Sequence, residues 1–138
     1  MTTRPIWAVA ALVMRPDDGR ILAINRPGAP DDLAMLGGHV DEGETPEEAV
    51  VRECREEASI EVDPACLEWL YDREDVSVGL VVRCFFVGRW TGAPESREPG
   101  LVVRWARAGE LTTPASTFRR WVAMALFAAG FPFRLEDG

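Results

Sequence analysis

A chain of 138 residues is long enough to form one domain with a buried core, and we expect a single domain over residues 1–138. Apolar residues make up 47% of the chain, which excludes a generally disordered protein. A formal net charge of −8 argues against general binding to nucleic-acid polymers or anionic membranes.

The first strand is predicted over Ile6–Met14, and the second over Arg20–Asn25. Pro16–Gly19 is typical of a hairpin turn between them. Arg26–Asp32 is rich in Pro, Gly and Asp and is predicted to be a loop, followed by a short strand at Leu33–Leu36. The opening apolar run is too short to span a bilayer, so we interpret it as a buried strand.

A helix is predicted over Pro46–Ala58, because its start carries several signals. Thr45 is a good N-cap, Pro46 suits the first helical position, and Glu48 completes a capping box with Thr45. The side of this helix that is expected to pack on a sheet consists of Val50, Val51, Cys54 and Ala58.

The opposite side of this helix is crowded with carboxylates. Glu53, Glu56 and Glu57 fall at helical spacings of three and four, so they share one face. Like charges so placed cost a few tenths of a kcal/mol per pair, which a bound cation would offset. Mg²⁺ prefers oxygen ligands, often carboxylates together with substrate phosphates. The pattern predicts a magnesium-phosphate site, and a solvated acidic helix is the alternative.

Three further strands follow, over Leu67–Asp72, Val76–Trp90 and Leu101–Ala106. Thr91–Gly100 is a polar loop between the last two. A final helix is predicted at roughly Ala115–Ala129. Its inward residues are expected to be Phe118, Val122 and Leu126.

The cysteines are Cys54, Cys66 and Cys84, an odd set without metal-site spacing. The only histidine is His39, so no Cys/His cluster is available. Free thiols in a reducing cytoplasm are the simplest explanation, and we expect a cytoplasmic protein.

The segment Gly38–Ile60, GHVDEGETPEEAVVRECREEASI, resembles the Nudix box, the signature of the Nudix hydrolases. The pattern is Gly-x5-Glu-x7-Arg-Glu-U-x-Glu-Glu-x-Gly-U, where U is a bulky aliphatic residue. Cys54 occupies one aliphatic position, and Ser59 replaces the glycine after the helix, where a left-handed residue is often needed. The order of the predicted elements resembles the Nudix fold, an α/β/α sandwich with a mixed β-sheet. Residues at the pattern's spacing are Gly38, Glu44, Arg52, Glu53, Glu56, Glu57 and Ile60.

This resemblance implies an enzyme that hydrolyses a diphosphate linked to another group, usually a nucleoside, by attack of water on phosphorus. It implies Mg²⁺ as cofactor, with Mn²⁺ as a substitute, and it implies a catalytic role for Glu53 and Glu57. Arg52 would position the acidic face, with Glu44 as its partner in the loop. The metal ligands implied are Glu53, Glu56, Glu57 and the backbone carbonyl of Gly38.

The general base differs among members of the family. Glu53 is one candidate, and Glu98 or, less favoured, Glu95 is another, because their loop precedes a strand that could pass the site. A solvated surface charge is the alternative for both loop residues.

The substrate is left open by these residues. Ala34-Met35-Leu36 stand where many relatives have an aromatic residue and a proline, so the pocket is expected to differ. A nucleoside di- or triphosphate leads, followed by a sugar nucleotide or a dinucleoside polyphosphate. A nucleotide-binding regulator without turnover is the alternative from another class. We expect a monomer or homodimer that binds a small molecule, without a membrane or nucleic-acid partner.

Overall fold

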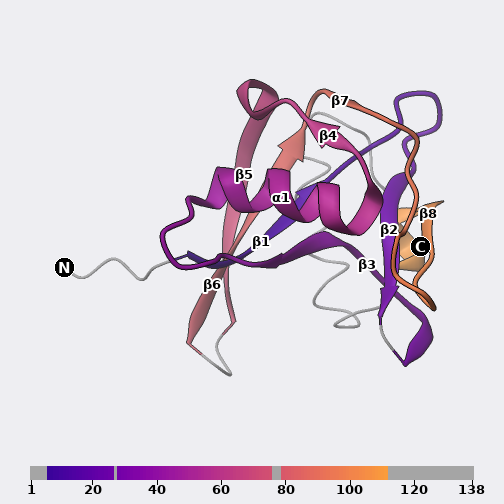
Figure 1. Ribbon diagram of the computed structural model, residues 1–138, viewed down its shortest axis with the longest axis horizontal. Coiled ribbons are helices and arrows are strands. Elements are labelled where there is room, and N and C mark those ends of the chain that lie inside the picture. Colours follow the sequence, from indigo (N-terminus) through magenta and orange to yellow (C-terminus); the bar gives the residue numbers. More distant parts are fainter. Residues whose placement is uncertain (1–5, 27, 76–78, 112–138) are drawn as a thin grey trace.

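The computed structural model describes residues 6–26, 28–75 and 79–111 (Figure 1). Its main sheet has six strands in the order β5-β6-β1-β3-β2-β8, and only the β1–β6 pair is parallel within it. The predicted mixed sheet is therefore confirmed. The strands are β1 (Ile6–Leu12), β2 (Ile21–Arg26), β3 (Ala29–His39), β5 (Leu67–Asp75), β6 (Leu80–Val87) and β8 (Val103–Ala106).

A second, two-stranded sheet pairs β4 (Glu61–Val62) with β7 (Trp90–Thr91). The long strand predicted over Val76–Trp90 was therefore wrong in its extent: β6 ends at Val87, and the chain then crosses to another sheet. Residues 76–78 of that prediction lie outside the described residues. Two short 3₁₀ turns complete the described elements, η1 (Pro64–Cys66) and η2 (Ala108–Glu110).

The loop predicted over Arg26–Asp32 was wrong in its second half, because β3 already begins at Ala29. Ala29 pairs with Arg26 of β2, and the register shifts before the next pair, Leu33 with Asn25. Gly28, in the left-handed region with φ of 74°, allows the tight reversal between the strands. Pairing with β2 outweighs the local preference of Pro and Asp for irregular structure.

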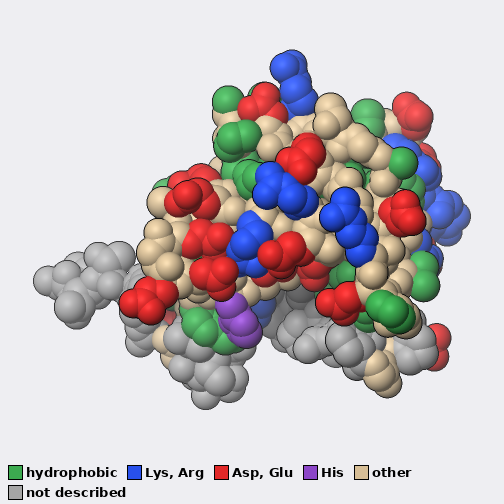
Figure 2. Space-filling view, in the orientation of Figure 1, with side chains coloured by type: hydrophobic (Ala, Val, Ile, Leu, Met, Phe, Trp, Pro, Cys, Tyr) green, Lys and Arg blue, Asp and Glu red, His purple; other side chains and the backbone are tan. Residues whose placement is uncertain are grey.

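Helix α1 runs over Pro46–Ala58, as predicted. The capping box is present: Glu48 N–H donates to Thr45 Oγ1 at 3.1 Å, and Thr45 N–H donates to Glu48 Oε1 at 2.9 Å. Asp and Glu side chains and arginines alternate over the outward surface of α1 (Figure 2). The helix ends at Ser59, which adopts the left-handed conformation with φ of 58° and ψ of 27°.

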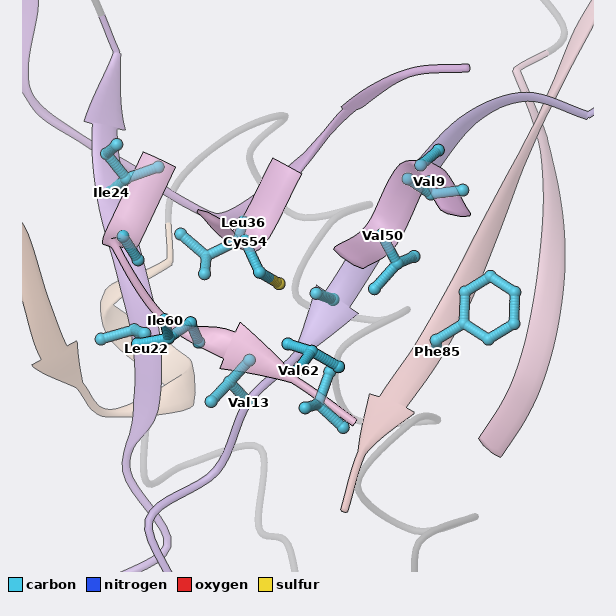
Figure 3. Close-up of a cluster of buried hydrophobic side chains, with 14 residues drawn as sticks. Val9, Val13, Leu22, Ile24, Leu36, Val50, Cys54, Ile60, Val62 and Phe85 are labelled. Atoms are coloured by element: carbon cyan, nitrogen blue, oxygen red, sulfur yellow. The ribbon is translucent and has the colours of Figure 1, made fainter. Parts of the chain in front are cut away.

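The core under α1 joins the helix to one face of the main sheet (Figure 3). Val50 and Cys54 of the helix are fully buried there against Leu36 of β3 and Val9 of β1. The other face of the sheet is also apolar. Its buried residues are Leu12, Met14, Ile21, Ala23, Leu33, Met35, Cys84, Ala106 and Leu111.

The described chain thus has an α/β fold with a mixed sheet and α1 on one face. The helix predicted at Ala115–Ala129, with its inward Phe118, Val122 and Leu126, lies outside the described residues. All three cysteines are free. None of the helices in the described ranges is long and apolar enough to cross a membrane.

Candidate active site

Two glycines bring the backbone of β3 against the acidic side of α1. The N–H of Gly37 donates to Glu57 Oε1 at 2.7 Å. A Cβ on Gly38 would overlap the carboxylate of Glu53, so glycine there makes room for that group. A Cβ on Gly37 would overlap the carbonyl oxygen of Val9 in the neighbouring strand β1. The backbone of β3 therefore lies close against the carboxylate of Glu53 and donates a hydrogen bond to that of Glu57.

Arg52 organises the loop that precedes the helix. Its Nε and Nη2 donate to the two oxygens of Glu44 at 2.8 and 3.0 Å, and Nη2 also donates to the carbonyl oxygen of His39 at 2.9 Å. The guanidinium and the N–H of Asp41 hold the pKa of Glu44 below its usual range. The predicted partnership of Arg52 with Glu44 is thereby present as a bidentate pair.

The same guanidinium contacts the acidic face. Nη1 of Arg52 donates to Glu53 Oε1 at 2.9 Å and to Glu56 Oε2 at 3.2 Å. Glu53 is largely buried, with 14% of its side chain exposed, whereas Glu56 exposes 58%. Arg52 thus fixes one carboxylate closely and leaves the other freer to turn.

The pKa of Glu57 is raised to about 8: burial is the main cause, the hydrogen bond from Gly37 opposes it, and the nearby charges of Glu53, Glu56 and Glu98 add to it. Burial also raises the pKa of Glu53, although Arg52 opposes this. A carboxylate that is this costly to ionise is well suited to bind a cation, because a positive charge would relieve both causes of the shift.

A cavity of about 400 Å³ opens beside these carboxylates. Glu98, from the loop between β7 and β8, faces the same cavity as the three glutamates of α1. No arginine among the described residues lines it. The remaining wall is mainly apolar. The full lining is Ile24, Asn25, Ala34, Met35, Gly37, Glu53, Glu56, Glu57, Ser96, Glu98 and Leu101.

The other predicted site residues lie around this cavity rather than on it. Glu44 and Arg52 stand behind the acidic face, and Gly38 adjoins Glu53. The side chain of Glu95 is exposed and does not line the cavity. In the described part of the chain, no three acidic or other ligating side chains converge closely enough to enclose an ion as they stand.

Sequence reasoning missed Asn25 and Ser96. Asn25 is the buried polar residue of the described core, and its Oδ1 accepts the N–H of Val102 at 2.7 Å. A polar side chain at the end of the apolar strand RILAIN was the signal that could have marked it. Ser96 carried no comparable signal, because short polar residues are ordinary in a loop.

Comparison with known proteins agrees with this geometry. Residues 4–127 match the family described as the NUDIX domain. An 8-oxo-dGTP diphosphatase of Haemophilus influenzae is 37% identical over 101 residues, 69% of this chain and 72% of that protein. A MutT-like protein of Streptomyces ambofaciens is 33% identical over 133 residues, 95% of this chain and 83% of that protein.

Among solved structures, the MutT NUDIX hydrolase from Burkholderia pseudomallei superposes with a TM-score of 0.66 and 29% identity, covering 91% of this chain and 98% of that one. The chain belongs to the NUDIX domain family, and it is an enzyme of the Nudix hydrolase class.

Proposed function

We propose that this protein is a Mg²⁺-dependent pyrophosphohydrolase that cleaves a diphosphate linkage in a nucleoside triphosphate. One observation carries the proposal: four carboxylates, three from α1 and one from the β7–β8 loop, line a single cavity whose other wall is largely apolar. Such a cavity can take the phosphates at its acidic end, through metal ions, and a base at its apolar end.

The donor set fits a hard divalent cation. The ligating groups proposed are the carboxylates of Glu53, Glu56 and Glu57 and the carbonyl of Gly38, all oxygen donors of the kind that Mg²⁺ and Mn²⁺ take. Because Glu56 lines the cavity and is largely exposed, its carboxylate can reorient toward an ion at little cost. Bound Mg²⁺ would neutralise phosphate charge and lower the pKa of a coordinated water.

The protein's own groups have separate tasks in this proposal. Arg52, held by Glu44, orients Glu53 and Glu56 from behind. Glu98 lines the cavity from the β7–β8 loop and is our choice of general base, with Glu53 as the other candidate.

The size and lining of the cavity support a nucleoside substrate. A volume of about 400 Å³ lies in the range of small-molecule sites, and Ile24, Met35 and Leu101 offer apolar surface for a base. The Haemophilus relative is named for 8-oxo-dGTP, so this compound and dGTP are the first substrates to test. We further propose that the enzyme is cytoplasmic, in keeping with its free thiols.

The decisive experiment is a substrate panel with Mg²⁺ or Mn²⁺, followed by identification of the products. The panel should contain dGTP, 8-oxo-dGTP, the other nucleoside triphosphates, a sugar nucleotide and a dinucleoside polyphosphate. Release of pyrophosphate and a nucleoside monophosphate is expected. Two products that each carry a monophosphate would move the substrate to a capped diphosphate. Tight binding without turnover across the panel would favour a nucleotide-binding regulator instead.

A further inference from the structure

Ser59 stands at the left-handed position after α1, where the Nudix box has glycine. It is the one non-glycine residue with positive φ among those that the structure describes. A side chain in this conformation costs free energy that glycine avoids. The hydroxyl of Ser59 has a specific partner, since it donates to the carbonyl oxygen of Glu95 at 2.8 Å.

This bond is one half of a two-sided anchor. The N–H of Glu95 donates to the carbonyl oxygen of Ala58 at 2.9 Å, so both backbone groups of Glu95 bind the helix exit. Gly92, at the start of the same loop, also packs against the helix exit: a Cβ there would lie 3.0 Å from the carbonyl oxygen of Ser59. The start of the β7–β8 loop is therefore tied to the end of the helix that carries the acidic face.

The far end of the same segment has its own anchor. Asn25 accepts the N–H of Val102 at 2.7 Å and donates to the carbonyl oxygen of Gly100 at 3.3 Å. The two anchors hold the ends of residues 95–102, which we call the Glu98 segment. Within it, Glu98 N–H donates to Ser96 Oγ at 3.2 Å, and Leu101 N–H donates to the carbonyl oxygen of Glu98 at 3.2 Å.

We propose that Ser59 is a positioning residue: its hydroxyl fixes the backbone of Glu95 and thereby holds Glu98 at the cavity, facing the carboxylates of α1. The inference rests on the proposed function, in which Glu98 works at that cavity. Ser59 itself does not line the cavity, so it acts only through the Glu98 segment. Serine in the left-handed conformation costs free energy, but unlike glycine it supplies the hydroxyl that ties the helix exit to the loop carrying Glu98.

Two variants separate this role from a simple contribution to folding. Ser59→Ala and Ser59→Gly both lose the hydroxyl, but only glycine relieves the left-handed conformation, so Ser59→Gly should melt at the higher temperature. Both should lose about three- to tenfold in kcat, the range of one hydrogen bond, with KM within about twofold. Activity that instead follows melting temperature, or an unchanged kcat in both variants, overturns the proposal.

Hydrogen exchange tests the positioning without any substrate. Amides of the Glu98 segment should exchange faster in Ser59→Ala than in the wild type. Arg55→Gln is the matched control, because it removes an exposed ion pair with Glu61 from the same helical turn but leaves the anchor intact. Unchanged exchange in the Ser59 variant, or equal acceleration in the control, overturns the inference.

Combination with Glu98→Gln shows whether Ser59 acts through Glu98. In that background, Ser59→Ala should cost little further activity; a full independent loss contradicts the inference. If Glu98→Gln turns over like the wild type, the positioning role is wrong although the enzyme assignment stands. If the wild type cleaves nothing in the panel, the proposed function fails, and the exchange result alone decides whether Ser59 holds the segment.

Discussion

The side chain of Glu57 accepts the backbone N–H of Gly37 at 2.7 Å, which joins the last turns of α1 to the glycine pair of β3. This bond orients the Glu57 carboxyl group and opposes, but does not cancel, the rise in its pKa that burial causes. It also places Glu57 deeper than Glu56, although both are on the same helical face. The acidic face is therefore graded, with a buried end at the strand and an exposed end toward solvent.

Glu57→Gln should abolish most turnover while the fold remains. Glutamine keeps an oxygen that can accept the Gly37 N–H, but it removes the negative charge that would bind a cation. We expect kcat to fall about 100- to 1,000-fold, typical of losing one electrostatic group in an active site. Steady-state kinetics measure this, and circular dichroism with thermal melting is the control for the fold. Activity within about twofold of the wild type would exclude Glu57 from the site.

The stability of the metal-free protein should fall as pH rises from about 4.5 to about 8. The native pKa of Glu57 is about 8 against an ordinary value of 4.5, so the native state retains a proton that the unfolded state has released. The raised pKa of Glu53 acts in the same direction. Denaturant unfolding at a series of pH values should show this slope in the wild type and a weaker one in Glu57→Gln.

Added Mg²⁺ should restore the folding stability that the metal-free protein loses near pH 8. Ion binding requires ionised carboxylates and therefore releases protons, so the affinity for Mg²⁺ should rise with pH up to about 8. Calorimetric titration in buffers of different ionisation enthalpy counts the released protons. Proton release that is the same in Glu57→Gln as in the wild type would contradict the role of Glu57.

Arg52→Lys should impair activity although it keeps the charge. Lysine has no planar fork to bind both oxygens of Glu44 while contacting Glu53, so the acidic face loses its support. We expect a loss of about 10- to 100-fold in kcat/KM, the range for groups that orient metal ligands. Arg55→Lys, on the exposed side of the same helix, is the matched control and should keep near wild-type activity.

Gly38→Ala and Gly37→Ala should fail in different ways. The added methyl at Gly38 meets the carboxylate of Glu53, which is the end of a flexible side chain and can move aside. That variant should fold but bind Mg²⁺ and turn over poorly. The methyl at Gly37 meets the backbone of Val9, which cannot yield, so that variant should lose several kcal/mol of stability, about as much as a severe core defect. Equal stability of the two variants by denaturant unfolding would contradict this account.

Local sequence signals predicted α1 well because its determinants are close together in the chain. Thr45 and Glu48 form the capping box within one turn, and the spacing of the glutamates sets their shared face. The same locality explains the wrong limits of β3 and of the strand predicted over Val76–Trp90. Those limits depend on pairing with β2 and β4, which are separate segments whose register a local pattern does not contain.

What the sequence alone determined is the acidic helix, its caps and the match of Gly38–Ile60 to a family signature, because these depend on spacings along one short stretch. Only the tertiary structure decided which distant groups reach that helix. It brought Glu98 to the cavity and left Glu95 as a backbone anchor, although both came from one loop. It also turned Asn25 toward the same loop. Such contacts join residues dozens of positions apart, and they exist only once the strands have paired.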